Sequence, residues 1–230
     1  MPDSFSHFTS QLKTVYDKAG LSEVAQRRRV IAKFALRHGL LYFSTDRSSS
    51  LTVPIVRGVT ASLDQNDTNI CIGSHKGYDI VFLERFASMT HPDYPSSKHH
   101  WHIMSFDLHS HSALPFVFIG TRQQSRTFYA NLFTTKREVR QLEPSSYNVP
   151  KQFSAHYTIV ASPAEQLILT QLLTTPITAA MAKFQHPFAV EIQDDTLSII
   201  TDSQQTSEAS LSKMLHYGLW LAEHIDANIT

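Results

Sequence analysis

The hydrophobic period of the chain changes at one point, and this change limits the fold more than any other feature. Residues 22–39 carry apolar side chains three or four positions apart, as on one face of a helix that ends at Gly39. Residues 4–19 show the same spacing, so the two segments predict an N-terminal helical pair. After Gly39 the apolar residues instead form short β-rich runs between turn residues. The chain is therefore expected to pass from helices into a sheet.

The region 40–121 is predicted to be an antiparallel sheet whose strands follow one another in chain order. Its clearest hairpin joins a strand at 69–73 to a strand at 78–83 through a turn at 74–77 that ends in glycine. The remaining elements expected in this region are strands at 40–43, 55–59, 101–108 and 116–119, and a polar loop at 87–97.

The last 80 residues predict a strand-helix-hairpin-helix unit. Ser162 and Glu165 form a capping box with Pro163 between them, which marks the start of a helix that breaks before Thr175. The other elements expected are a strand at 153–160, a hairpin of 188–192 with 197–200, and a closing helix after Ser207. The fold class is thus α+β, with segments 1–39, 40–121, 122–150 (a connecting segment) and 151–230, in one cooperative domain or several.

Composition excludes several classes of protein. Twenty Lys plus Arg balance twenty Asp plus Glu, so no strong field attracts nucleic acid. The single cysteine, Cys71, rules out a disulfide scaffold and is expected to be a small buried side chain. No apolar run approaches the ~20 residues of a membrane span, and residues 1–5 do not open a secretory signal. A cytoplasmic globular protein is therefore expected.

Motifs for common catalytic chemistry are missing from the sequence. It contains no P-loop, no G-x-G-x-x-G turn, no G-x-S-x-G elbow and no H-E-x-x-H pair. The leading prediction is a non-enzymatic binding or interaction module, a monomer or small homo-oligomer that docks on a protein or an envelope-associated complex. Peripheral membrane association stays open, and no cofactor is expected. An enzyme whose site assembles from dispersed residues is a further alternative.

Histidines are the one anomaly, because five of the thirteen lie within residues 99–111. His100 and His102 are two positions apart, so both imidazoles face the same side of a strand, as zinc sites on sheets require. His109 and His111 share the opposite side, and His109 lies ~23 Å from His102 if the segment is one strand. These four residues are the candidate zinc ligands, with further ligands expected from His75, His91 or His156.

The alternative to the binding module is accordingly a metal-dependent hydrolase built on the segment 99–111. The simpler interpretation is that these histidines lie at polar strand ends. The carboxylates add little: Glu84 and Arg85 are interpreted as an exposed ion pair at the end of a strand, and Asp194 with Asp195 as a hairpin turn.

Several segments together resemble an uncharacterised bacterial family of unknown function. They are Ile72-Gly73-Ser74-His75-Lys76-Gly77-Tyr78-Asp79-Ile80, the runs 105–108 and 116–120, then 153–162 and 188–200. The resemblance covers roughly residues 70–200 and implies a soluble sheet region followed by strand, helix and hairpin. This chain departs from the family in lacking the two-helix membrane hairpin near the N-terminus. The family has no established activity, so the resemblance implies architecture and no site residues.

Overall fold

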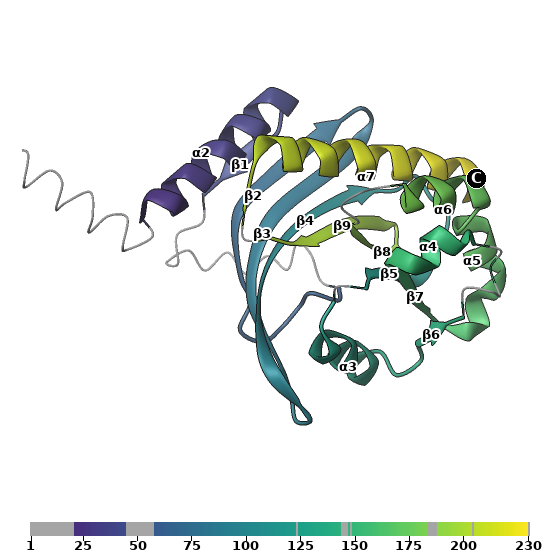
Figure 1. Ribbon diagram of the computed structural model, residues 1–230. Coiled ribbons are helices and arrows are strands. Elements are labelled where there is room, and N and C mark those ends of the chain that lie inside the picture. Colours follow the sequence, from purple (N-terminus) through teal and green to yellow (C-terminus); the bar gives the residue numbers. More distant parts are fainter. Residues whose placement is uncertain are drawn as a thin grey trace, which may run out of the picture.

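One antiparallel sheet forms the centre of the computed structural model, which describes residues 21–44, 58–122, 124–143, 147, 149–183, 188–203 and 205–229 (Figure 1). In these residues the strand order is β1-β2-β3-β4-β9-β8-β5-β7-β6. The strands are β1 (Leu41–Phe43), β2 (Asn66–His75), β3 (Tyr78–His91), β4 (Tyr94–Asp107), β5 (Leu114–Thr121), β6 (Arg140–Leu142), β7 (Tyr157–Ala161), β8 (Ala189–Asp194) and β9 (Thr196–Asp202). With helices on both faces, this confirms an α+β fold.

The helices cover the two faces of the sheet unequally. Figure 1 shows α7 lying along one face beside α2, with α4 to α6 at the far end of the sheet, while α3 lies on the opposite side. Each face therefore has its own apolar core, one larger than the other. The helices are α2 (Leu21–His38), α3 (Arg126–Thr135), α4 (Lys151–His156), α5 (Gln166–Leu172), α6 (Thr175–Ala182) and α7 (Glu208–Ile229), with a 3-10 turn at Pro163–Glu165.

The β2–β3 hairpin is tighter than predicted. Its strands run through His75 and Tyr78, which pair directly, so that only Lys76 and Gly77 form the turn. Both turn residues have positive φ, 52° and 87°. This is the pattern of a two-residue type I′ turn, which matches the twist of antiparallel strands.

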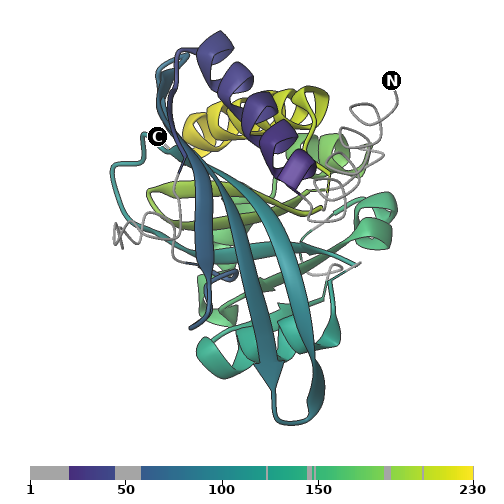
Figure 2. The same cartoon turned by 90° about the vertical axis from the view of Figure 1, so that its left-hand side faces the viewer.

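The polar loop predicted at 87–97 is wrong, because these residues continue the β3–β4 hairpin. Ala87 and Met89 alternate with polar residues and bury their side chains in the core on the α3 side. The ladder reaches His91 and Tyr94, and the hairpin projects from the body of the molecule (Figure 2). Because every second side chain packs in the core, residues 87–97 form strands although their composition is typical of a loop.

The expected chain order of the strands is also wrong beyond β4. The β8–β9 hairpin enters the sheet between β4 and β5, pairing Ile103 with Ile200 on one side and Phe118 with Glu191 on the other. Strands from 40–121 and from 151–230 therefore belong to the same sheet. The division of the chain into separately folding segments stays a prediction.

The second half otherwise follows the predicted order, with one local error. Residues 153–156 belong to α4, and the strand predicted at 153–160 begins only at Tyr157. The turn of helix stacks the Phe153 ring on the Tyr157 ring, with centroids 4.9 Å apart, and both side chains are buried. Ser162 caps the following turn as expected, its hydroxyl accepting from the Ala164 amide.

The N-terminal helical pair is described only in part. α2 begins at Leu21 and ends before Gly39, whose φ is 72°. The predicted helix at 4–19 and most of the predicted strand at 55–59 lie outside the described residues. Ile31 and Phe34 of α2 are fully buried in the same core as the closing helix α7, and Lys33 and Arg37 pair with Glu208 at the start of α7.

α7 approaches β4 closely at one glycine. A side-chain carbon added to Gly218 would lie 2.1 Å from the Phe106 ring. Hydrogen at this position therefore lets the helix rest on the aromatic ring, and any larger side chain would force the two elements apart.

Candidate functional site

On the face of the sheet that α2 and α7 cover, the side chains change from apolar to polar in the middle of β3 and β4. Along β3, Ile80 and Phe82 are followed on the same face by Glu84, and along β4 the side chains of His102 and His100 face the same way. Glu84 pairs across the strands with His102. All three polar side chains are buried, with exposures of 1% for Glu84, 1% for His102 and 6% for His100.

The nitrogen and oxygen atoms of these three side chains converge. Glu84 Oε1 lies 3.1 Å from His102 Nε2 and 3.3 Å from His100 Nε2. The contact with His102 is a hydrogen bond. The contact with His100 lacks hydrogen-bond geometry, so within the described part of the chain His100 Nε2 is buried beside the carboxylate without a hydrogen-bond partner. The stacked ring of Phe86, 4.1 Å from the His100 ring centre to centre, fixes this imidazole.

A backbone irregularity in β2 adds a fourth side chain, Asn69. The pairing of β2 with β3 shifts register between Thr68 and Cys71, as at a β-bulge, and Asn69 has φ of 50°. Asparagine tolerates this left-handed conformation better than most residues. The Asn69 amide nitrogen donates to Glu84 Oε2, and its carbonyl oxygen accepts from the Tyr42 hydroxyl at 2.7 Å.

The cluster holds its carboxylate ionised. Burial alone would raise the pKa of the Glu84 carboxyl, but His100, His102 and Asn69 outweigh this effect and lower that pKa below its ordinary value. A buried negative charge thus lies against two imidazoles, which is the donor set of many divalent-metal sites.

A cavity of about 760 Å³ lies beside the cluster and leads to its edge. Its lining includes His100 and Phe86 from the sheet, Arg27 from α2, and Thr206 from the segment before α7. The Thr206 hydroxyl lies 2.9 Å from both Glu84 Oε1 and His102 Nε2. The cluster is therefore buried, and His100 and Thr206 lie between it and the cavity.

The predicted histidine candidates separate into two groups. His100 and His102 share a face as predicted, in the middle of a strand rather than at its polar end. His109 and His111 follow β4 outside the sheet: His109 stacks on Tyr78 near Asp226, and His111 is exposed. The side chains proposed as further ligands lie elsewhere, His75 beside His38, His91 beside Asp93, and His156 exposed on α4.

The interpretation of Glu84 and Arg85 as an exposed ion pair is wrong. Both are buried in the interior of β3, and as neighbours in a strand they face opposite sides of the sheet. Arg85 binds Asp67 through two hydrogen bonds and Thr60 through a third. The sequence does contain a signal of this burial, because both charged residues lie inside the apolar run of β3, with Leu83 before them and Phe86 after them.

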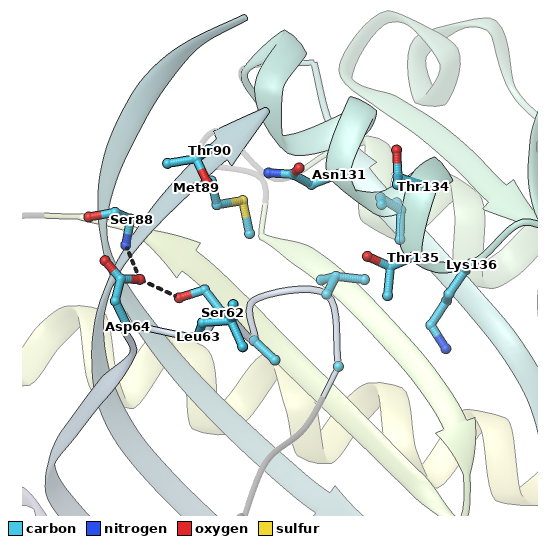
Figure 3. A pocket seen from close by; sticks show the side chains of 14 residues that line it. Ser62, Leu63, Asp64, Ser88, Met89, Thr90, Asn131, Thr134, Thr135 and Lys136 are labelled. Carbon is cyan, nitrogen blue, oxygen red and sulfur yellow. Dashed lines mark hydrogen bonds between the residues drawn. The ribbon is translucent and has the colours of Figure 1, made fainter. Parts of the chain in front are cut away.

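A second cavity, of about 520 Å³, lies on the opposite side of the sheet, and it is here named the α3 cavity (Figure 3). Asn131 points from α3 toward Met89 on β3, and Ser62 and Asp64 form the loop edge, where Asp64 accepts hydrogen bonds from the Ser62 hydroxyl and the Ser88 amide. The other lining residues are Gly58, Val59, Ala61, Leu63, Thr90, Leu132, Thr134, Thr135 and Lys136.

Glu191 on β8 anchors one wall of the α3 cavity from beneath. Its carboxylate accepts a hydrogen bond from the Val59 amide at 3.1 Å, and a side-chain carbon on Gly58 would collide with it at 2.5 Å. Burial raises the pKa of Glu191 to about 7, although the Val59 amide, Lys136 and Arg85 act in the other direction.

Cys71 is fully buried, as predicted, and it faces the larger core. Burial, followed by the charge of Glu84, raises the pKa of its thiol to about 12. The thiolate that a nucleophile or a metal ligand requires is therefore disfavoured.

Comparison with known proteins identifies a related fold and no family. No family model and no curated protein matches the chain. The crystal structure of the mycobacterial trehalose monomycolate transport factor A, TtfA, matches with a TM-score of 0.57 and 10% sequence identity, covering 88% of this chain and 94% of that chain. At this identity the likeness is one of fold. Among the described residues, no helix is long and apolar enough to cross a membrane.

Proposed function

We propose that this protein is a non-enzymatic binding module that takes the apolar part of an amphiphilic ligand into the α3 cavity. The observation that carries the proposal is the lining of this cavity. Val59, Met89 and Leu132 supply apolar surface, with Leu63 exposed at the rim, and hydroxyl, amide and charged groups make up the rest of the lining. A cavity of a few hundred Å³ that combines apolar surface with polar groups is a usual form of a small-molecule site.

The two ends of the α3 cavity differ in charge. Asp64 lies at the loop end, where its carboxylate is held by two hydrogen bonds. Lys136 lies at the other end, with its ammonium 4.0 Å from the centre of the Phe116 ring and bonded to Gln193. An anionic group on the ligand would therefore be favoured at the Lys136 end, which gives the bound molecule a direction.

The fold comparison supports a transport-related role for this binding. The matched protein is described as a trehalose monomycolate transport factor, and the match extends over most of both chains.

The test is binding of a fluorescently labelled fatty acid to the full chain, before and after the α3 cavity is filled. Asn131→Trp places a large ring between α3 and Met89, and we expect it to weaken probe binding at least tenfold. Gln171→Trp adds the same ring at an exposed position on α5 and should leave binding unchanged. Equal affinity of both variants and the unchanged protein, or no binding by any of them, would contradict the proposal.

The alternative of a metal-dependent hydrolase stays a prediction. It requires both a metal beside His100 and His102 and a substrate in the neighbouring cavity. Metal binding and hydrolysis of a substrate at this place can be measured separately from ligand binding at the α3 cavity.

A further inference from the structure

We infer that Glu84, His100 and His102 form a binding site for one divalent transition metal ion, with zinc as its representative. The inference is independent of the α3 cavity, which lies on the other face of the sheet. It is carried by the convergence of three donor atoms, one from each residue, that all lie within 4.8 Å of one another.

The spacing of the donors fits a tetrahedral ion. Zinc binds imidazole nitrogen and carboxylate oxygen at about 2.0–2.2 Å, so neighbouring donors around a tetrahedral ion lie roughly 3.3–3.6 Å apart. Glu84 Oε1 is 3.1 Å from His102 Nε2 and 3.3 Å from His100 Nε2. The third distance, between the two imidazole nitrogens, is within 4.8 Å. Rotation of the imidazole side chains toward the carboxylate would bring the three donors to the spacing of a tetrahedral ion.

The hydrogen bonds of the cluster leave one donor atom unexplained. Among the described residues, His100 Nε2 has no hydrogen-bond partner, although it is buried 3.3 Å from the carboxylate and its ring is held by Phe86. Burying a polar atom in this way destabilises the fold, because the atom loses its hydrogen bonds to water. Coordination of a metal by His100 Nε2 and Glu84 would remove this cost.

Hydrogen bonds from neighbouring residues orient the carboxylate. Asn69 donates to Glu84 Oε2 and leaves Oε1 directed at the two imidazoles. Tyr42 in turn donates to Asn69, whose left-handed backbone brings its amide to this place. Hydrogen bonds from residues that do not touch the ion orient the ligands of metal sites in the same way.

One side of the cluster is bounded by Thr206 and not by the sheet. Thr206 lies 2.9 Å from Glu84 Oε1 and His102 Nε2, and it lines the 760 Å³ cavity together with His100. A bound ion would take the Thr206 hydroxyl, or a water molecule that replaces it from the cavity, as its fourth ligand. Three protein ligands with one open position is the arrangement of exchangeable and catalytic zinc sites.

The experiment measures binding of Zn²⁺ and Co²⁺ to the full chain, purified without a histidine tag and stripped with a chelator. We expect one ion per chain by calorimetry, and a Co²⁺ absorption spectrum of four-coordinate nitrogen and oxygen ligands without the thiolate charge-transfer band that Cys71 would produce. Glu84→Gln and His100→Gln should each weaken Zn²⁺ binding at least 100-fold, since loss of a residue that only hydrogen-bonds to a metal ligand already costs about ten- to 100-fold in affinity.

Matched controls are the other histidines of the same segment. His109→Gln and His111→Gln remove imidazoles outside the sheet and should leave the affinity and the stoichiometry unchanged. The melting temperature of the chain should rise with Zn²⁺ concentration, as it does for any ligand that binds only the folded state. Because the cobalt spectrum is read on the unchanged protein, the test stands even if a cluster variant fails to fold.

Three results would overturn the inference. One is the absence of binding by the unchanged chain at micromolar Zn²⁺. Another is loss of the ion in the His111→Gln or His109→Gln variant, which would place it on the surface. The third is a cobalt spectrum with a thiolate ligand.

Discussion

Glu191 should make the folded chain less stable as the pH rises from about 4.5 to about 7. The folded protein holds this carboxyl proton up to a pH of about 7, whereas an ordinary glutamate has a pKa of 4.5. Between these values the unfolded chain binds fewer protons than the folded chain, so the free energy of unfolding falls with rising pH. At about 1.36 kcal/mol for each pH unit, the total loss is about 3 kcal/mol.

The cause of this shift is visible in the structure. Glu191 is 6% exposed, under the Gly58 turn, and the nearest cationic groups, Lys136 and Arg85, have other partners in Gln193 and Asp67. Of the residues that the structure describes, the Val59 amide donates a hydrogen bond to the carboxylate, and one such donor does not replace the water lost on burial.

The assay is urea unfolding between pH 4.5 and 8, followed by tryptophan fluorescence, for the unchanged protein and Glu191→Gln. Glutamine keeps the acceptor for Val59 and does not ionise, so the difference in unfolding free energy should grow in its favour by about 3 kcal/mol as the pH rises through this interval. Glu138→Gln, at an exposed position, should show no such growth. A difference for Glu191→Gln that stays constant with pH would refute the reasoning.

Three substitutions test the packing of the fold by thermal and urea unfolding. Gly218→Ala adds a carbon 2.1 Å from Phe106 and should cost about 1–3 kcal/mol despite better helix propensity; a gain in stability would contradict the close approach. Phe34→Ala empties a fully buried site between α2 and the sheet and should cost about 3–5 kcal/mol, whereas a loss below 1 kcal/mol would mean that α2 is not part of the cooperative unit. Ser162→Ala removes the acceptor of the Ala164 amide and should cost about 0.5–2 kcal/mol, and an unchanged melting temperature would show that the cap is not needed.

Local signals in the sequence predicted local structure well. Gly39 ends α2, Ser162 caps the turn before α5, and the run 74–77 contains the turn of the β2–β3 hairpin. Each of these features depends on backbone conformations and hydrogen bonds within a few residues. Such features can be read from a short window, because the residues that determine them are adjacent in the chain.

The order of the strands in the sheet and the ends of the long strands could not be predicted from a short window of sequence. The place of the β8–β9 hairpin between β4 and β5 depends on pairing over about 100 residues, for which no local pattern codes. At 87–97, proline and serine are typical of loops, but cross-strand packing of Met89 and Ala87 extends the hairpin. At 153–156, burial of Phe153 against Tyr157 favours a helical turn over the alternation that the sequence suggests.

Half of the buried cluster could be predicted from the sequence. The two-residue spacing of His100 and His102 gave their shared face, because the side-chain period of a strand is fixed at two. Glu84 was not assigned to them, since its position opposite His102 depends on the register of β3 with β4. The role of Asn69 was harder still to predict from the sequence. A bulge in β2, and not the regular alternation of side chains along a strand, brings its amide to Glu84.

Two neighbouring charged residues of β3 connect the sites on the two faces of the sheet. Glu84 is directed to the histidine cluster, and Arg85, one position later, is directed to Asp67 and Thr60 on the other face. Thr60 belongs to the turn after Gly58, which also bounds the α3 cavity. A slip of β3 by one residue would exchange these two buried charges between the faces, so the pair adds to the apolar pattern that specifies the register of β3. The same register that brings Glu84 to His102 therefore places Arg85 beneath the wall of the α3 cavity.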